Sequence, residues 1–228
     1  MKKAVIISGT SVIGKEIIKL LYKDSISIIA TGRDDKKLKE LKDEFNNIVT
    51  FKLDLTKNPT EILNKHKQLF FDADFVLICS GYGELNFQLE REIELNTMKV
   101  NVNGCAEVLL YFINLFKINE KGYIAIITSI AGVMPSSVSP AYNASKAFLS
   151  NYIEGLQLHL KSINSPIKIT DIKPGLVYTP MAKGNRLIGV MPVTKVAKQI
   201  YLKLKKAPKS IIVTKRWKVV YYILKLVN

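Results

Sequence analysis

Short apolar runs alternate with stretches of helical periodicity along the whole chain, and this alternation restricts the fold more than any other feature. Seven runs bounded by turn residues are predicted strands: 4–8, 26–31, 48–53, 75–79, 123–128, 167–172 and 210–214. The predicted helices between them are 15–23, 34–44, 60–70, 90–116, 140–161 and 194–205. Because the strands are continuously apolar and separated by helices, we expect an α/β fold: a Rossmann-like, doubly wound parallel sheet of about seven strands flanked by helices.

The length of 228 residues suits a single domain with a full core. We predict a catalytic domain over residues 1–214 and a basic, aromatic C-terminal tail over 215–228. The longest irregular stretch is expected at 177–192, and loops of that length often act as lids. No run approaches 18 apolar residues, and the first apolar run is too short for a signal peptide, so a cytoplasmic location is expected. Cys79 and Cys105 form no CxxC pair and are predicted to be reduced and buried.

Positive charge is concentrated at the C-terminal end. Of the net charge of +15, residues 172–228 carry +13, from thirteen Lys or Arg and no Asp or Glu. The preceding 171 residues hold 21 basic and 19 acidic side chains. Such asymmetry favours an anionic partner, which could be an acidic membrane surface, a nucleic acid or an anionic substrate. A solvated face in a lysine-rich protein is the alternative.

One tyrosine stands out from the others by its surroundings in the sequence. Tyr142 precedes Lys146 by four residues and follows Ser129 by thirteen. The Tyr-x-x-x-Lys spacing recurs twice more, at Tyr201/Lys205 and Tyr221/Lys225. Neither later pair has a hydroxyl side chain thirteen positions before its tyrosine. Asn101 lies upstream of the first pair, and a Pro-Gly-x-Val-x-Thr run lies downstream at 174–179. This ordered set indicates redox chemistry between a carbonyl and an alcohol with a nicotinamide cofactor.

The loop after the first strand predicts a dinucleotide site. A strand, a glycine-containing loop and a helix can bind a pyrophosphate through backbone N–H groups and the helix N-terminus. The loop residues expected to do so are Gly9, Thr10, Ser11, Ile13 and Gly14. An ordinary strand–helix turn is the alternative, because only two glycines are present.

Arg33 follows the second strand, where a dinucleotide-binding unit meets the adenosine ribose. An acid here would bind a free 2′-hydroxyl, whereas arginine accommodates a 2′-phosphate, so we expect NADP(H) in preference to NAD(H). Asp34 and Asp35 are expected to begin the next helix. Asp54 could contact the adenine amino group or cap the helix after it. Ser80 and Gly81, after the fourth strand, are small enough for the backbone to approach a ligand.

These residues, taken in order, resemble the short-chain dehydrogenase/reductase family, in its classical type. The resemblance covers nearly the whole chain and is carried by Asn101, Ser129, Tyr142, Lys146 and the run Pro174-Gly175-Leu176-Val177-Tyr178-Thr179. Two departures stand out. The family's Gly-x-x-x-Gly-x-Gly loop, aligned without a gap from Gly14, has Ser8 and Val12 at its first two positions; aligned on Gly9, it is one residue short. The family's Asn-Asn-Ala-Gly segment is Ile78-Cys79-Ser80-Gly81 here.

The resemblance implies a role for each residue of the set. Tyr142 would be the general acid or base. A free tyrosine has a pKa of about 10, and the Lys146 ammonium, one helical turn away, would favour the phenolate. Lys146 would also bind the nicotinamide ribose. Ser129 would hold the substrate oxygen, and Asn101 a water for proton relay. Pro174, Gly175, Val177 and Thr179 would bind the cofactor, with Thr179 on the nicotinamide carboxamide.

Partners and alternatives follow from the same observations. The two long helices resemble the family's dimer contact, so a homodimer or homotetramer is expected, acting on a small carbonyl or alcohol substrate. The tail could be an amphipathic helix on anionic lipid, a cover over the substrate cleft or a contact with a partner subunit. An apolar or lipid-like substrate is therefore one hypothesis. The competing hypotheses are a catalytically inactive cofactor sensor or scaffold, and a nucleic-acid-binding protein, which lacks any recognisable motif. We expect no metal site and no bound nucleic acid.

Overall fold

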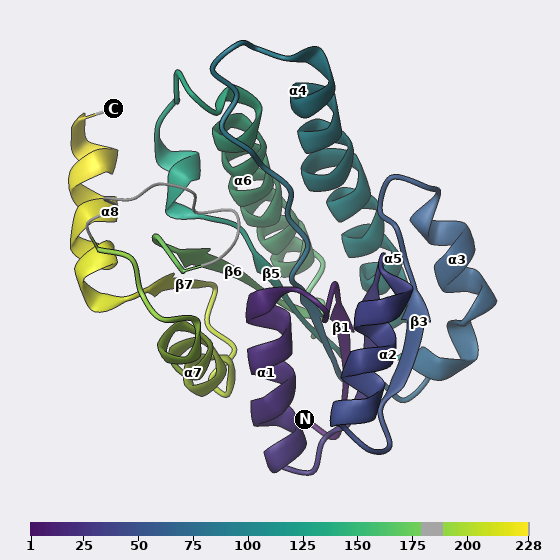
Figure 1. Cartoon of the computed structure of the whole chain (residues 1–228). Coiled ribbons are helices and arrows are strands. Elements are labelled where there is room, and N and C mark those ends of the chain that lie inside the picture. The colour runs from purple at the N-terminus through teal and green to yellow at the C-terminus, as the bar shows by residue number, and fades with distance from the viewer. Residues whose placement is uncertain (179–188, 228) are drawn as a thin grey trace.

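A seven-stranded parallel sheet forms the centre of the molecule in the computed structural model, which describes residues 1–178 and 189–227. The strands are β1 (Lys3–Ile7), β2 (Ser27–Gly32), β3 (Val49–Lys52), β4 (Phe75–Ile78), β5 (Tyr123–Ile127), β6 (Lys168–Pro174) and β7 (Ser210–Val213), in the spatial order β3-β2-β1-β4-β5-β6-β7 (Figure 1). Every neighbouring pair is parallel. The predicted doubly wound fold and all seven predicted strands are confirmed.

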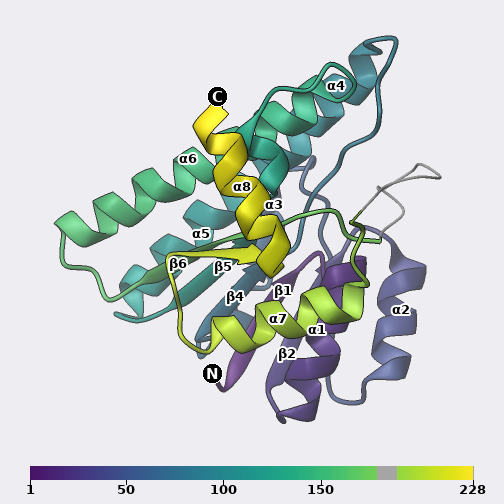
Figure 2. The ribbon, with the colours of Figure 1, turned by 90° about the vertical axis from the view of Figure 1, so that its left-hand side faces the viewer.

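Helices cover both faces of this sheet (Figures 1 and 2). On one face lie α1 (Val12–Lys23), α2 (Asp35–Glu44) and α7 (Val193–Leu204). On the other lie α3 (Pro59–Lys65), α5 (Cys105–Ile118) and α6 (Pro140–Ser162). Alternate residues of each strand enter different cores: Ala4 and Ile6 pack with the first set, and Val5 and Ile7 with the second. A strand covered on both faces must be apolar throughout, which explains the continuous runs in the sequence.

Three helical segments differ from the sequence prediction, in addition to α1, which begins before residue 15. The stretch predicted at 90–116 is α4 (Arg91–Met98), a π-helical turn over Lys99–Gly104 and then α5. The helix predicted at 60–70 ends at Lys65 and continues as a 3₁₀ turn over Lys67–Phe70. A further 3₁₀ turn, Ile130–Val133, was not predicted. π-Helical turns occur frequently at functional sites, and this one contains Asn101.

The basic tail is a helix, α8 (Lys215–Val227), that packs beside β7 and the Ile130–Val133 turn (Figure 1). The stretch predicted as a long loop, 177–192, includes a bridge between Val177 and Met191. Within the residues that the structure describes, no helix is long and apolar enough to cross a membrane.

The strand order reverses at the centre of the sheet. From β1 the chain runs outward to β2 and β3, then returns to β4 on the other side of β1. In such sheets, ligands bind outside the carboxyl ends of the strands at this reversal. The loops that follow β1, β2, β4, β5 and β6 all begin at that edge, and they contain most of the predicted site residues.

Candidate active site

Tyr142 lies in the first turn of α6, at the carboxyl edge of the sheet. Pro140 begins this helix, as proline often does at the first helical position. The tyrosine ring is half-buried against Gly83, where a β-carbon would overlap it. The 3₁₀ turn after Ser129 lies against the same helix, because a β-carbon on Gly132 would come within 2.6 Å of the Ala147 nitrogen. Glycine at both positions therefore allows the loops to close around Tyr142.

Ser129 follows β5 and caps the 3₁₀ turn. Its Oγ accepts a hydrogen bond of 3.1 Å from the backbone N–H of Ala131. A serine hydroxyl that accepts at its oxygen keeps its own O–H to donate. The side chain is half-buried. Its position at the end of β5, beside the start of α6, makes Ser129 a donor at the same edge of the sheet as Tyr142.

Lys146 places a buried ammonium beside the tyrosine. Only 2% of the residue is exposed. Its Nζ donates to the Ile127 carbonyl at 3.4 Å and lies 5.6 Å from the centre of the Tyr142 ring. Its charge also reaches Cys105, although burial dominates there and raises the pKa of that thiol to about 11. No carboxylate among the described residues pairs with Lys146. A buried charge without such a partner is costly. The Lys146 ammonium can lower this cost by binding other polar groups.

Asn101 ties the loop after β4 to α6. Its Oδ1 accepts from the Tyr82 N–H at 2.8 Å, and its Nδ2 donates to the Tyr82 carbonyl at 2.7 Å. The same Nδ2 donates to Ser145 Oγ at 2.9 Å, and that hydroxyl donates to the Tyr142 carbonyl at 2.7 Å. The Asn101 side chain is thus linked to the Tyr142 backbone through the Ser145 hydroxyl. The water relay expected of Asn101 remains a prediction.

The glycine loop enters α1 earlier than predicted. The helix begins at Val12 rather than at residue 15, because Ser11 Oγ accepts the Gly14 N–H at 3.2 Å and caps it. Within the described part of the chain, the N–H groups of Val12 and Ile13 have no acceptor, and the first turn contains no acid. These donors and the positive end of the helix can bind a phosphate.

The two loop glycines allow close packing of the chain. A β-carbon on Gly9 would come within 2.9 Å of Ile18, and one on Gly14 within 2.8 Å of the Ser8 carbonyl oxygen. Ser8 itself has a φ of 57°, the left-handed region that favours glycine. Its hydroxyl bonds Ser80 Oγ at 2.7 Å. The structure therefore favours the alignment without a gap, in which Ser8 stands where the family has its first glycine.

Cys79 is buried next to this loop. Burial raises the pKa of its thiol far above the ordinary value, and a hydrogen bond with Ser11 lowers it only in part. Cys105 is also buried, and neither cysteine forms a disulfide. The expectation of two buried thiols is confirmed.

Arg33 projects from the end of β2 and is exposed. It has no carboxylate partner within hydrogen-bonding range among the described residues. Asp34 caps α2 by accepting the Lys37 N–H at 3.1 Å, as predicted. Asp34 at the N-cap and Asp35 in the first turn of α2 make no ion pair with Arg33, so its guanidinium is free to bind an anion at this edge.

Asp54 does not cap the helix that follows it, contrary to one of the two predicted roles. Asn58 holds the N-cap position of α3. The Asp54 carboxylate instead accepts from the Thr56 N–H at 2.9 Å and the Thr56 hydroxyl at 2.8 Å, which closes a local turn. Burial tends to raise the pKa of Asp54, but these bonds and the charges of Lys57 and Arg33 hold it below its ordinary value. Contact with an adenine remains a prediction.

The end of β6 lies under the C-terminal helix. Pro174 ends the strand, and a β-carbon on Gly175 would overlap the indole ring of Trp217 from α8. Val177 is buried, and its neighbour Tyr178 donates its N–H to the Met191 carbonyl at 2.9 Å. Thr179, predicted to bind a carboxamide, lies outside the described residues. Trp217 was not predicted as part of this region, because its contact with Gly175 is long-range.

Three other residues near the site were not among the predicted site residues. Ser145 is fully buried and links Asn101 to Tyr142. Gly83 makes room for the tyrosine ring, and Gly132 for the turn after Ser129. The serine directly before Lys146 and the glycine three residues after Ser129 were the available signals, but neither side chain carries chemistry of its own.

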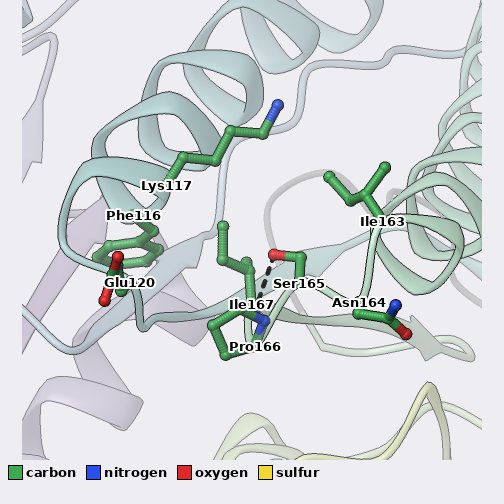
Figure 3. Close-up of a pocket in the computed structure, with 8 residues that line it drawn as sticks. All are labelled: Phe116, Lys117, Glu120, Ile163, Asn164, Ser165, Pro166 and Ile167. Atoms are coloured by element: carbon green, nitrogen blue, oxygen red, sulfur yellow. Dashed lines mark hydrogen bonds between the residues drawn. The ribbon is translucent and has the colours of Figure 1, made fainter.

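A separate hollow of about 370 Å³ lies at the opposite edge of the sheet, near the amino ends of β5 and β6. It is lined by the last turn of α5 and the loop that connects α6 to β6, and Ser165 there accepts the Ile167 N–H at 3.3 Å (Figure 3). The residues of the candidate site all follow the other ends of the strands, so this hollow is not part of the site.

Fold and site together define a dinucleotide-binding oxidoreductase of the Rossmann-like class, and the comparisons with known proteins agree. The family model described as short chain dehydrogenase matches residues 2–187. The chain belongs to the short chain dehydrogenase family. It is 30% identical over 192 residues to an uncharacterized oxidoreductase of Staphylococcus saprophyticus, covering 79% of this chain and 80% of that protein.

Solved structures support the fold. A short chain dehydrogenase from Burkholderia cenocepacia J2315, in complex with NADP, has a TM-score of 0.85 at 18% identity and covers 98% of this chain and 94% of its own. A short chain dehydrogenase/reductase from Burkholderia phymatum, in complex with NAD, has a TM-score of 0.84 at 17% identity. The match covers 97% of this chain and 92% of that structure's chain. Structures of this fold thus include complexes with either nucleotide.

Proposed function

We propose that this chain is an NADP(H)-dependent oxidoreductase that interconverts a carbonyl compound and a secondary alcohol. One observation carries the proposal above the others. The Lys146 ammonium is buried beside Tyr142 without a carboxylate partner among the described residues, at the sheet edge where dinucleotides bind. A cation in that position suits a ribose hydroxyl and a phenolate, and it has no evident role in holding the fold together.

The residues present fit a nicotinamide dinucleotide. Free N–H groups at the start of α1 suit its pyrophosphate, and exposed Arg33 suits a 2′-phosphate. Ser80 and Gly81 follow β4, and Pro174, Gly175 and Val177 stand at the end of β6, at the same carboxyl edge. They are proposed to contact the cofactor between these groups and Tyr142. The bound dinucleotide would supply or accept the hydride.

The protein's own residues would hold the substrate and move a proton. In the reduction direction, Tyr142 donates its phenolic proton to the substrate oxygen while that oxygen gains negative charge; in the oxidation direction, the phenolate takes the proton back. Ser129 donates its free O–H to the same oxygen and fixes its position. Lys146 stabilises the phenolate electrostatically. Asn101 and Ser145 hold the Tyr142 backbone, and Asn101 is proposed to organise a water chain that returns the proton to solvent.

The substrate is proposed to be apolar or lipid-like. Apolar side chains flank the catalytic turn: Met134 is 42% exposed and its carbonyl accepts from Asn143, next to Tyr142. Tyr178, after β6, is 78% exposed. Exposed apolar groups on segments that border a candidate site favour an apolar ligand.

The test is a calorimetric titration of the purified protein with NADPH and NADH, followed by a screen of carbonyl substrates. We expect NADPH to bind at least about tenfold more tightly, a difference of about 1.4 kcal/mol. Arg33→Ala should remove that preference, and the control Lys36→Ala, on exposed α2 nearby, should keep it. Tighter NADH binding would contradict the Arg33 argument. Binding of neither nucleotide would favour the catalytically inactive scaffold.

Assembly and location are proposed on separate grounds. Exposed apolar side chains lie along α4, α5 and α6, among them Leu95, Leu110, Phe148 and Leu158, and they suit a homodimer or homotetramer contact. Two free, buried thiols suit a reducing compartment such as the cytoplasm, with a peripheral contact to the membrane. We keep residues 1–214 as the catalytic domain and 215–228 as the tail, of which α8 packs back onto the domain. Light scattering on the eluting protein would report the assembly, and a monomer would contradict it.

A further inference from the structure

A hollow lined by cationic side chains lies between α7, β7 and the start of α8. Its volume is about 760 Å³, and its ten lining residues include five cations and no acid. The cations are Lys195, Lys203, Lys215, Arg216 and Lys218. The helices α7 and α8 that form it lie next to each other on one side of the molecule (Figure 2). This basic hollow concentrates the charge that the sequence places in its C-terminal quarter.

Protein carboxylates do not compensate these cations in the described part of the chain. Each of the ion pairs found there involves other residues; the nearest in sequence, Lys205–Asp24, uses a different lysine. Burial lowers the pKa of Lys203, and the charge of Lys218 lowers it further. Two cations that repel each other in a concave site favour an anionic ligand.

The exposed face of α8 adds an apolar stripe beside the basic hollow. Val219, Tyr222, Ile223 and Leu226 follow the spacing i, i+3, i+4, i+7 and are between 51% and 85% exposed. The opposite face of the same helix, with Trp217, Val220, Tyr221 and Leu224, is half-buried against the body. A helix that packs one apolar face against the body does not need a second apolar face in order to fold. The outer apolar stripe therefore indicates a contact outside this chain.

Cations stand on both borders of the outer apolar stripe. At 100° per residue, Lys218 and Lys225 lie on one side of the stripe. Arg216 lies on the other side, where its guanidinium also donates to the Gly189 carbonyl at 3.3 Å and to Met191 Sδ at 2.8 Å. Long basic side chains at such borders can lie along apolar surface while their charged ends reach headgroups. A nucleic acid would leave Ile223 and Leu226 exposed to water, whereas a bilayer satisfies both the charges and the apolar side chains.

We propose that the α7–α8 face docks on an anionic lipid bilayer. The basic hollow takes phosphate headgroups, and the outer apolar stripe enters the boundary between headgroups and acyl chains, with α8 lying in the membrane plane. The inner face of α8 stays packed on Gly175 through Trp217. In combination with the proposed function, this places the substrate side of the site next to the lipid from which an apolar substrate would arrive. The docking itself does not depend on turnover.

The single tryptophan of the chain reports the orientation of α8. Vesicles that contain lipids brominated in the acyl chains quench indoles that enter the bilayer. We expect the Trp217 emission of the wild-type protein to be unchanged, because this residue faces the body, and an Ile223→Trp variant to gain a quenched component. Strong quenching of wild-type Trp217 would mean that the helix leaves the body on binding, and would overturn the proposed arrangement.

The decisive experiment is flotation of the full chain with vesicles of phosphatidylcholine and phosphatidylglycerol in equal parts, compared with phosphatidylcholine alone. No cofactor or substrate is present, so failure here is distinguishable from failure of the proposed function, which the NADPH titration reports. We expect flotation only with anionic vesicles, and its loss in high salt. The variant Lys203→Gln with Lys218→Gln should bind about 25-fold more weakly, at about fivefold per lysine.

Two controls separate these effects from general charge and hydrophobicity. Lys36→Gln with Lys39→Gln, on α2, removes the same charge at the far edge of the sheet and should float like the wild type. Ile223→Ser with Leu226→Ser should lose flotation, whereas Phe71→Ser, at a comparably exposed position, should not. Flotation that is equal with neutral vesicles, or unchanged in both the hollow and the stripe variants, would overturn the proposal. So would binding of a labelled single-stranded oligonucleotide through the hollow lysines without any binding to vesicles.

Discussion

Two Tyr-x-x-x-Lys pairs of identical spacing lie at opposite edges of the sheet and differ in the partner of the lysine. Tyr142 and Lys146 begin α6 at the carboxyl edge, and Lys146 has no carboxylate partner among the described residues. Tyr201 lies in the last turn of α7 and Lys205 directly follows that helix, near the end of α1. There Asp24 accepts hydrogen bonds from the Tyr201 hydroxyl and, at 3.1 Å, from Lys205.

The difference shows why a sequence pattern needs its surroundings to define a function. At α7 the lysine lies only 4.8 Å from the tyrosine ring, closer than the 5.6 Å at α6. Yet the Asp24 carboxylate neutralises the charge of Lys205, and it accepts the hydrogen bond that the Tyr201 hydroxyl donates. Burial and this carboxylate raise the pKa of Tyr201 to about 12, the wrong direction for a base near neutrality. Proximity of lysine to tyrosine is therefore not sufficient, and an uncompensated ammonium is the distinguishing feature.

Removal of the tyrosine hydroxyl should give the largest contrast between the pairs. We expect Tyr142→Phe to lower kcat by a factor of about 10²–10⁴, the contribution of a positioned proton donor, with NADPH binding retained. Tyr201→Phe should leave kcat within about twofold. Steady-state kinetics and calorimetry on both variants measure this. Equal losses in the two variants would show that the spacing alone, or a general effect on folding, accounts for the activity.

The two lysines give the next contrast. Lys146→Met should lower kcat by a factor of about 10², at the lower end for one electrostatic group, and should weaken NADPH binding. Thermal stability should not fall, because a buried charge without a carboxylate partner is replaced by an apolar side chain of similar size. Lys205→Met should change neither activity nor cofactor affinity. A fall in the melting temperature of Lys146→Met with unchanged kinetics would make Lys146 structural.

The sequence was sufficient for the architecture but not for the local backbone at the site. Apolar runs bounded by turn residues predict each strand to within about two residues, since strands covered on both faces leave that pattern. The π turn around Asn101 leaves no such pattern, because no residue type requires a bond from i to i+5. Ser8 is a similar case. The sequence shows only that a glycine is missing, whereas the structure shows serine in the left-handed conformation, held by its bond with Ser80.

The candidate site divides in the same way. Side chains that carry chemistry cannot be exchanged for other types, so Ser129, Tyr142 and Lys146 could be proposed from their type and order alone. Groups that act by shape or by long-range packing were not. Gly83 and Trp217 are examples, since their contacts join segments that lie far apart in the chain. An amphipathic helix was one of the alternatives for the tail, but the division of α8 into an inner and an outer apolar face depends on how it packs.

The smallest expected effect is on stability at alkaline pH, and it tests the Asp24 side of the comparison. The pKa of Tyr201 is about 12 in the folded protein and about 10 when unfolded. Between these values the native state keeps a proton that the unfolded state loses, so the free energy of unfolding falls as pH rises through that window, and the contribution is complete below about pH 10. Because Asp24 is partly exposed, solvent screening reduces the contribution to about 1 kcal/mol.

Tyr201→Phe cannot ionise, so its loss of stability between about pH 9 and about pH 11 should be smaller than that of the wild type by about 1 kcal/mol. Urea unfolding at the two pH values measures the difference, and other tyrosines that titrate cancel in the comparison. Asp24→Asn keeps the phenol but removes the charge, and should give an intermediate slope. Identical slopes in the wild type and Tyr201→Phe would show that Asp24 does not hold the Tyr201 proton. The contrast between the two pairs would then rest on Lys146 alone.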